Sequence, residues 1–420
     1  MDSLFNSTEG LLDHEMTRQE FYQQMLPFVS QIKCGHTKFH PDENWTTNYY
    51  FNIDKVFPVK LFIQPHQAFF VAGYNSDLTI PAGAELISIN NRPIDTIINR
   101  LVENFLSDGN NSTFKYLEMS HYFSAYYANL YEPTDSFLLV YRDQNRIKEL
   151  TIPSISHSFI DLYEKRIAGM KPEVPPYKLD WLSDNTVLMT ISSFWMNVPH
   201  LSFKQFLKSS FAEINKKGIK HLIIDLRDNE GGIDARGSLL LSYLVDKPFR
   251  YYDRLEVTTN KKYSFTAHAR LPKFYNLMRM LVSKTDSGSY VWKHNQNLKF
   301  QKPQKNPFTG KVYVLTNGAS FSVSAEFAAV THYLKRATFI GEETGGGYYG
   351  NNSGTFVIVT LPNSRMNLGI PMMAYYLAVK DYPYKDKGVI PDYEVNQTIQ
   401  SILEKKDVVL TSTLQLIKKL

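Results

Sequence analysis

The chain has 420 residues, 43 % of them hydrophobic and 21 % charged, which is the composition of a globular protein with room for two or three domains. Its formal net charge of +5 is scattered in short clusters, and no apolar run approaches the ~18 residues of a membrane span, so nucleic-acid binding and a transmembrane helix are both disfavoured. The single cysteine, Cys34, excludes an internal disulfide and a cysteine-rich metal site.

Residues 1–50 are predicted to form a helical segment that leads into a histidine loop. Apolar residues recur at helical spacing between positions 9 and 34, and Thr17 with Glu20 matches a capping box. Gly35-His36-Thr37 follow directly. A histidine just after a helix-ending glycine can face a cleft, although an exposed loop histidine fits the same pattern. The polar N-terminus lacks the regions of a signal peptide, as expected of a cytoplasmic protein or of one whose leader was removed.

Residues 51–155 change to short strand-like runs, at 59–63, 68–74, 85–89, 136–141 and 147–152, with a helix-like stretch at 95–105. The piece 80–95, Ile-Pro-Ala-Gly-Ala-Glu-Leu-Ile-Ser-Ile-Asn-Asn-Arg-Pro-Ile-Asp, resembles the middle of a PDZ domain. PDZ-like domains bind extended peptide termini at a sheet edge, and a small β domain without a ligand is the alternative. Residues 156–178, with Pro172, Pro175 and Pro176, are predicted to be a linker.

From residue 179 the pattern is that of an α/β domain. A strand at 186–191 and a helix at 201–217 precede the apolar strand 221–225, which continues into a Gly-rich turn at 226–232 and a helix. The same order of strand, turn and helix recurs at 311–335. Repeated units of this kind predict a mostly parallel sheet with ligands at the carboxyl ends of its strands. The long, basic and aromatic stretch 247–310 is predicted to be an insertion beside the cleft.

The turn at 316–324, Thr-Asn-Gly-Ala-Ser-Phe-Ser-Val-Ser, places serines at the start of a predicted helix. A nucleophilic serine suits this position, because the free N–H groups and the helix dipole stabilise an oxyanion there. On this stretch alone, an ordinary turn with Ser320, Ser322 and Ser324 as helix caps is the favoured interpretation.

The turns at 225–232 and 316–324 together resemble those of the C-terminal processing and tricorn-type serine peptidases. Further matches follow the family's order: Gly35-His36-Thr37, the PDZ-like piece, Ile340-Gly-Glu-Glu-Thr-Gly345 and Gly388-Val-Ile-Pro-Asp392. The resemblance implies a mostly parallel, ClpP/crotonase-like α/β core at 179–420 with an inserted PDZ-like domain. It also implies a serine peptidase that acts on peptide or protein substrates, whose C-termini the PDZ-like domain could bind.

The family pattern places the nucleophile at Ser322, two residues before Ser324. The processing branch uses a lysine base 25 residues later, but that position is Gly347 here, and Lys335 lies at the far end of the helix. The tricorn-type branch uses a histidine from an early loop, which matches His36. A histidine can take the serine proton and return it to the leaving amine near neutral pH.

The remaining roles also follow from the resemblance. An oxyanion hole is expected from the N–H of Val323 with an N–H at Gly231 or Gly232. Asp386 is the candidate to orient the histidine, and Glu343 is its rival. The expected chemistry needs no metal or organic cofactor, and family members are commonly exported, so a periplasmic or cell-surface location is expected.

Three other readings compete with the peptidase. The main alternative is a peptide- or lipophile-binding protein on the same fold, but such a binder has no reason to keep both Ser322 and His36. A thiol enzyme would depend on Cys34 alone, which is more typical of a small buried apolar residue. A phosphate site at 345–347 lacks the Lys-Ser/Thr that a P-loop requires.

Overall fold

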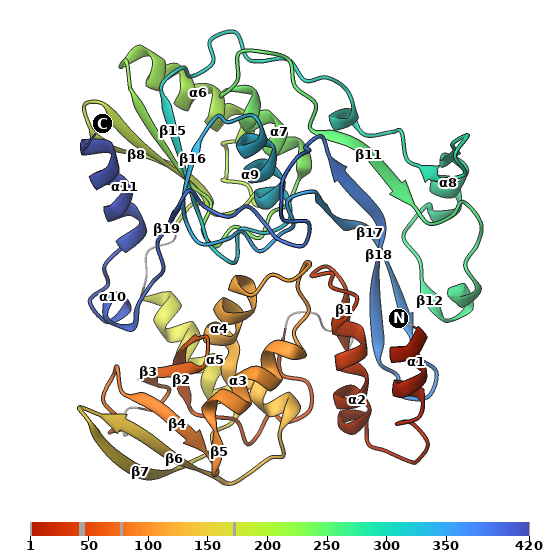
Figure 1. Ribbon diagram of the computed structural model, residues 1–420, viewed down its shortest axis with the longest axis vertical. Coiled ribbons are helices and arrows are strands. Elements are labelled where there is room, and N and C mark those ends of the chain that lie inside the picture. The colour runs from red at the N-terminus through yellow and green to blue at the C-terminus, as the bar shows by residue number, and fades with distance from the viewer. Residues whose placement is uncertain (1, 42–46, 76–78, 171–173, 420) are drawn as a thin grey trace.

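The structure, a computed structural model, describes residues 2–41, 47–75, 79–170 and 174–419. Two lobes lie one above the other, and a long antiparallel hairpin flanks both of them (Figure 1). The upper lobe in that view is the α/β core, and the lower lobe is a small β domain with its own helices. The mixed α/β class predicted from the sequence is confirmed.

The core sheet has the strand order β19-β16-β15-β10-β9-β8, parallel throughout except for the antiparallel pair β8 and β9. Its strands are β8 (Tyr177–Ser183), β9 (Thr186–Ile191), β10 (His221–Asp225), β15 (Lys311–Thr316), β16 (Thr338–Gly341) and β19 (Tyr393–Glu394). Three helices pack on one face: α6 (Phe203–Lys216), α7 (Asp234–Ser242) and α9 (Val323–Tyr333). The helix α11 (Val408–Lys418) covers the other face, and α10 (Ile399–Leu403) precedes it.

Alternation along the strands explains this two-sided burial. On β10, Leu222 and Ile224 pack against the helices α6, α7 and α9, whereas Ile223 between them packs toward α11. A strand with apolar residues on both faces must be covered on both faces, which is why the run 221–225 is continuously apolar. The β10 and β15 strands lie side by side in register, so the two turns that follow them open at the same edge of the sheet.

The small β domain has the strand order β2-β3-β4-β6-β7, with β5 paired to β4. Its elements are β2 (Val59–Gln64), β3 (Gln67–Gly73), β4 (Glu85–Ile89), β5 (Arg92–Pro93), α3 (Ile94–Glu103), α4 (Thr113–Leu130), β6 (Ser136–Asp143) and β7 (Arg146–Pro153). The helix α4 packs along β2, the edge strand, and its apolar residues complete the domain's core. The sequence pattern did not predict α4.

The hairpin of β17 (Gly350–Thr360) and β18 (Asn367–Leu377) forms the centre of another sheet, which was not predicted from the sequence. Its other strands are β1 (Lys38–His40), β11 (Tyr252–Val257), β12 (Ala269–Arg270), β13 (Ser283–Lys284) and β14 (Tyr290–Val291). The insertion 247–310 supplies β11 to β14 and the short helices η1 (Ser264–His268), α8 (Tyr275–Met280) and η2 (Gln296–Leu298).

The N-terminal segment differs from the single predicted helix over 9–34. It forms two helices, α1 (Asp2–Glu9) and α2 (Arg18–Ser30), and residues 10–17 between them are not helical. The predicted capping box at the start of α2 is present, because the Thr17 hydroxyl accepts from Glu20 N and the Glu20 carboxylate accepts from Thr17 N. Within the expected linker, His157–Gly169 form the helix α5, capped by Ser156, while Pro172 lies outside the described residues.

Candidate active site

Ser322 lies at a strained turn between β15 and α9. Its backbone has φ +52° and ψ −122°, a region that residues with side chains rarely adopt. A serine on a sharp strand-to-helix turn presents its hydroxyl outward, away from the backbone of both elements. The next residue, Val323, is the first of α9, and its N–H makes no hydrogen bond within the described residues. The serine turn thus combines an outward hydroxyl with a free helix-terminal donor.

His36, near the N-terminus, lies beside Ser322 in the folded chain. Its Nε2 lies 3.2 Å from the Ser322 Oγ, although the two residues are 286 positions apart. The histidine loop is fixed downstream by β1, which pairs with β18 at Lys38 and Gly369. The structure therefore brings together the two residues that the family resemblance indicated as nucleophile and general base.

Gly35 allows the histidine loop to approach the serine turn. A Cβ at this position would lie 2.8 Å from the ring of Phe321, so only glycine fits without displacing that ring. The Phe321 ring in turn lies 4.6 Å from the imidazole of His36 and stacks on Phe114 of α4 at 5.4 Å. Close packing on one side of the imidazole keeps water away from that face.

Burial sets the protonation state of the histidine. It lowers the pKa of His36 to about 3, and the nearby Lys38 ammonium adds to the shift. The imidazole is therefore neutral near pH 7, as a general base must be. For Nε2 to accept the serine proton, Nδ1 must carry the ring hydrogen, and Nδ1 has no hydrogen-bond partner within the described residues.

The two carboxylates proposed as orienters lie elsewhere. The Asp386 carboxylate accepts from Asn110 Nδ2 at 3.1 Å, and Glu343 accepts from the N–H of Gly388 at 2.9 Å and from Lys387 at 3.2 Å. Neither of them hydrogen-bonds the unpartnered Nδ1 of the histidine ring. These two carboxylates, both in late segments of the chain, therefore bind residues of neighbouring loops.

Asp108, which the sequence analysis did not single out, touches the histidine loop directly. Its Oδ1 accepts from the N–H of Gly35 at 2.8 Å, and the residue is buried. Burial raises the pKa of Asp108 to about 6, opposed by the N–H groups of Gly35 and Gly347. One aspartate in a polar loop carries no sequence signal that distinguishes it from its neighbours.

The Gly-rich turn after β10 lies against Ser322. A Cβ on Gly231 would lie 2.7 Å from the Cβ of Ser322, and the residue has φ +99°. Its N–H is already donated to Asn229 Oδ1 at 2.9 Å. The N–H of Gly232, by contrast, makes no hydrogen bond to any described residue. Of the two glycines named from the sequence, Gly232 has the available donor.

Hydrogen bonds join the two turns into one unit. Asn317 accepts from the N–H of Asp228 at 3.0 Å and donates its amide to the Asp228 carboxylate at 2.8 Å. The Ser320 hydroxyl donates to the carbonyl of Leu226 at 2.8 Å and is fully buried. Ser320 therefore has a structural role, which leaves Ser322 as the serine that faces the histidine.

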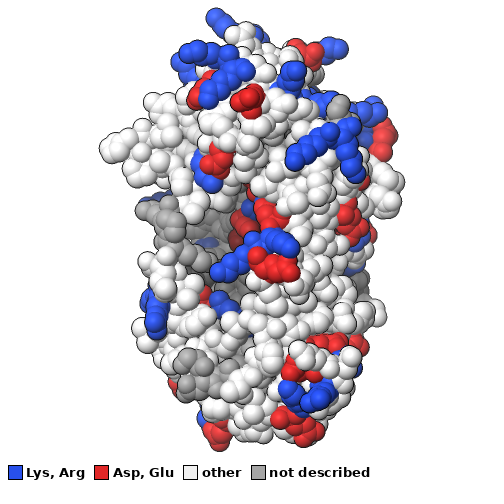
Figure 2. Space-filling model, turned by 90° about the vertical axis from the view of Figure 1, so that its left-hand side faces the viewer, with Lys and Arg blue, Asp and Glu red and all other residues white. Residues whose placement is uncertain are grey.

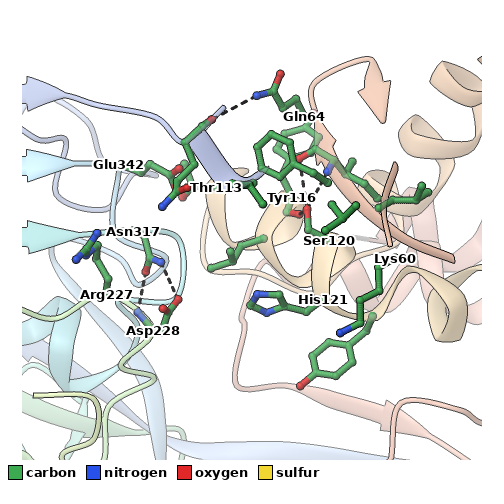
Figure 3. Close-up of a pocket in the computed structure, with 18 of the residues that line it drawn as sticks. Lys60, Gln64, Thr113, Tyr116, Ser120, His121, Arg227, Asp228, Asn317 and Glu342 are labelled. Carbon is green, nitrogen blue, oxygen red and sulfur yellow. Dashed lines mark hydrogen bonds between the residues drawn. The ribbon is translucent and has the colours of Figure 1, made fainter. Parts of the chain in front are cut away.

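A cavity of about 1430 Å³ separates the small β domain from the core beside these turns. The surface is hollowed between the lobes, with charges of both signs around the hollow (Figure 2). Lys60, Ser120 and His121 line it from the small domain, while Asp228 and Asn317 line it from the core (Figure 3). Ser322 and His36 do not line this cavity, although the turns that carry Asp228 and Asn317 lead to them.

Within the described ranges, no group of three or more His, Cys, Asp or Glu side chains is arranged to hold a metal ion. None of the helices in the described part of the chain has the length and apolar character to cross a membrane.

A serine on a strained strand-to-helix turn, with a neutral histidine at its hydroxyl, is the arrangement expected of a serine hydrolase site. The chain belongs to peptidase family S41, whose sequence profile matches residues 185–395, half of the chain. It is a serine-type peptidase, and the predicted membership among the C-terminal processing and tricorn-type peptidases is confirmed.

The chain is similar to several solved structures at low identity, and the two of CPAF share its fold. Mature CPAF matches with a TM-score of 0.65 and 13 % identity over 100 % of this chain and 90 % of its own. Mature CPAF complexed with lactacystin matches with a TM-score of 0.66 and 13 % identity, over 99 % of this chain and 91 % of its own. The photosystem II D1 C-terminal processing protease matches with a TM-score of 0.41 and 14 % identity, over 96 % of this chain and 92 % of its own.

Proposed function

We propose that the protein is a serine endopeptidase that works through an acyl-enzyme, with Ser322 as nucleophile and His36 as general base. The observation that carries the proposal is the 3.2 Å approach of His36 Nε2 to Ser322 Oγ. This distance is within hydrogen-bond reach of a neutral nitrogen, which is the geometric requirement for a general base.

In the proposed reaction, Ser322 Oγ bonds to the scissile carbonyl carbon while its proton passes to His36 Nε2. The carbonyl electron pair moves onto the oxygen, which the N–H groups of Val323 and Gly232 stabilise. Collapse of this intermediate breaks the C–N bond, and the histidine proton goes to the leaving amine. Water then bonds to the acyl carbon while His36 takes its proton. Collapse of this second intermediate breaks the C–O bond to Ser322, which takes the proton back as the acid product is released.

The burial of His36 has two opposing effects on this mechanism. Burial keeps His36 neutral before the reaction, but it also makes the imidazolium costly once the proton has moved. The negative oxyanion forms beside the imidazolium in the same step, so the two charges compensate each other in the substrate complex. We therefore assign the main stabilisation of the imidazolium to the bound substrate. Asp386 is not included in the proposed machinery, because its carboxylate is hydrogen-bonded to Asn110.

We also propose that residues 51–155 form a PDZ-like domain on the ClpP/crotonase-like core and bind the C-terminus of a substrate between β2 and α4. In this structure the Ser120 hydroxyl of α4 accepts from the N–H of Ile63 at 2.9 Å. An incoming peptide strand must displace that contact. Periplasmic or cell-surface residence remains an expectation from the family.

The test is covalent labelling with a fluorophosphonate, followed by peptide mass analysis. We expect the label on Ser322 in the native protein, no label in Ser322→Ala, and slow labelling in His36→Ala. Ser324→Ala is the matched control, because its hydroxyl lies two residues from the nucleophile and is buried with no hydrogen-bond partner among the described residues. Labelling that survives His36→Ala at the native rate would exclude this histidine as the base. An unlabelled native protein would argue against the peptidase mechanism itself.

A further inference from the structure

The insertion contains a segment of strongly one-sided charge. Residues 257–285 hold no Asp or Glu and the basic residues Lys261, Lys262, Arg270, Lys273, Arg279 and Lys284. The whole chain has a formal net charge of +5, so all other residues together carry −1. The net positive charge of the protein therefore resides in this one segment.

The same segment exposes large apolar side chains around α8. Phe274 is 76 % and Met280 79 % exposed, and Leu277 between them is more than half exposed. Leu277 and Met280 lie three residues apart in α8, which places them on one side of the helix, and Phe274 is the residue that caps its N-terminus. Tyr275 is buried and anchors the turn, and Arg279 stacks over its ring at 5.6 Å. The apolar stripe is thus held in an exposed position by a fixed anchor.

The shape of this surface limits its partner. The helix α8 lies at the outer edge of the molecule, away from the core and the small domain (Figure 1). Side chains exposed this far stand out from the surface, whereas small-molecule sites are concave. A contact between two copies through this face would bring two segments of charge +6 together, which is unfavourable. Protruding apolar residues among cations are instead the features of an interfacial membrane contact.

We propose that α8 and its flanking basic residues dock the protein on an anionic lipid bilayer. Phe274, Leu277 and Met280 enter the interface between headgroups and acyl chains, and the lysines around them bind anionic headgroups. The strand β12 connects this surface to the site, because it pairs with β17 at Arg270 and Ile358. On β17, the ring of Phe356 lies 6.5 Å from that of His36.

The test is sedimentation of the full chain with vesicles of phosphatidylcholine and phosphatidylglycerol, compared with phosphatidylcholine alone. We expect binding to the anionic vesicles only, weakened by salt. Replacing Lys261, Lys262 and Lys273 by Gln removes three charges worth about fivefold each, so affinity should fall about 100-fold. The triple variant Phe274→Asn, Leu277→Ser, Met280→Ser should lose at least about tenfold. Asn is used at position 274 because that residue has φ +62°, which Asn tolerates.

The matched control is Leu162→Ser, Met170→Ser, which removes two equally exposed apolar side chains at α5 and should leave vesicle binding unchanged. Thermal unfolding checks the fold of every variant, and all substituted side chains are largely exposed. Absent binding, equal binding to both kinds of vesicle, or an effect of the control as large as that of the α8 variant would overturn the proposal. So would a concentration-dependent dimer that the α8 variant abolishes, which would assign the surface to a second copy.

Discussion

Asp108 offers the sharpest test of how the histidine loop is held in place. Its role as the hydrogen-bond acceptor for Gly35 N–H can be separated from the effects of its charge and its shape. Leu and Asn are close to Asp in size, but only Asn keeps an oxygen that can accept from Gly35 N–H. Asp108→Leu leaves that buried N–H without a partner, at a cost of about 1–3 kcal/mol, and releases the loop that carries His36. A displacement of the base by about 1 Å can reduce the rate of the chemical step about 100-fold.

At pH 8, the stability of the Asn variant should move in the opposite direction to its activity. The pKa of Asp108 is raised from 3.8 to about 6, so this carboxyl contributes less stability as pH rises through that range. The shift corresponds to about 3 kcal/mol of lost stability at pH 8, which either neutral side chain avoids. Asp108→Asn should therefore be at least as stable as the native protein at pH 8. Its labelling of Ser322 should be within about fivefold of the native rate, since a neutral acceptor is weaker by about 1 kcal/mol.

The assay is the rate constant for fluorophosphonate labelling of Ser322, measured beside thermal unfolding at pH 5 and pH 8. Ser107→Ala is the control, because it removes a buried hydrogen bond to Asn111 in the same loop without touching Gly35. Rapid labelling of Asp108→Leu would refute the reasoning, since the loop would then hold His36 without an acceptor.

Four further predictions follow from the site and its surroundings. Gly231→Ala should abolish labelling, because its Cβ would lie 2.7 Å from that of Ser322; a labelled alanine variant would show that the turn can shift. Labelling should stay level from pH 8 to pH 5, because burial lowers the pKa of His36 to about 3; a midpoint near 6.5 would contradict this. Burial raises the pKa of Glu326 from 4.5 to about 7, so native stability should fall by about 3 kcal/mol as pH rises through that range, and Glu326→Gln should remove this dependence in pH-dependent unfolding. Ser120→Ala should tighten binding of C-terminal peptides in a fluorescence titration, by about fivefold if its hydrogen bond competes; unchanged affinity would place the peptide elsewhere.

The regular elements of the core were predictable because their signals are local. The strands 186–191 and 221–225 are short apolar runs, and the structure places β9 and β10 there. The helix α4 escaped prediction since its aromatic residues occupy several faces and its backbone is kinked at Tyr122. The hairpin of β17 and β18 escaped because its strands pair with β1 and β11, far away in sequence.

The candidate site residues also divide into those with a local sequence signal and those whose placement depends on contacts distant in sequence. Three serines at the turn were locally equivalent in the sequence. In the structure, the positive φ of Ser322, its contact with His36 and the buried hydrogen bond of Ser320 distinguish them. The contact of His36 with this serine joins segments 286 positions apart, so only the resemblance could suggest it. The position of Asp386 in its motif did not reveal its contact with Asn110, because that contact depends on the loop after α3.

That loop shows why the position of His36 depends on the small β domain. The N–H of Gly109 donates to the carbonyl of Lys33 at 3.0 Å, and Asp108 accepts from Gly35, so one loop of the small domain binds both ends of the turn before His36. On its other side, the N–H of Asn110 donates to the carbonyl of Asp386 in the core at 2.8 Å. The histidine is therefore positioned relative to Ser322 through the small domain as well as through β1. A movement of that domain against the core must displace His36, whereas Ser322 and the two turns, which belong to the core alone, stay in place.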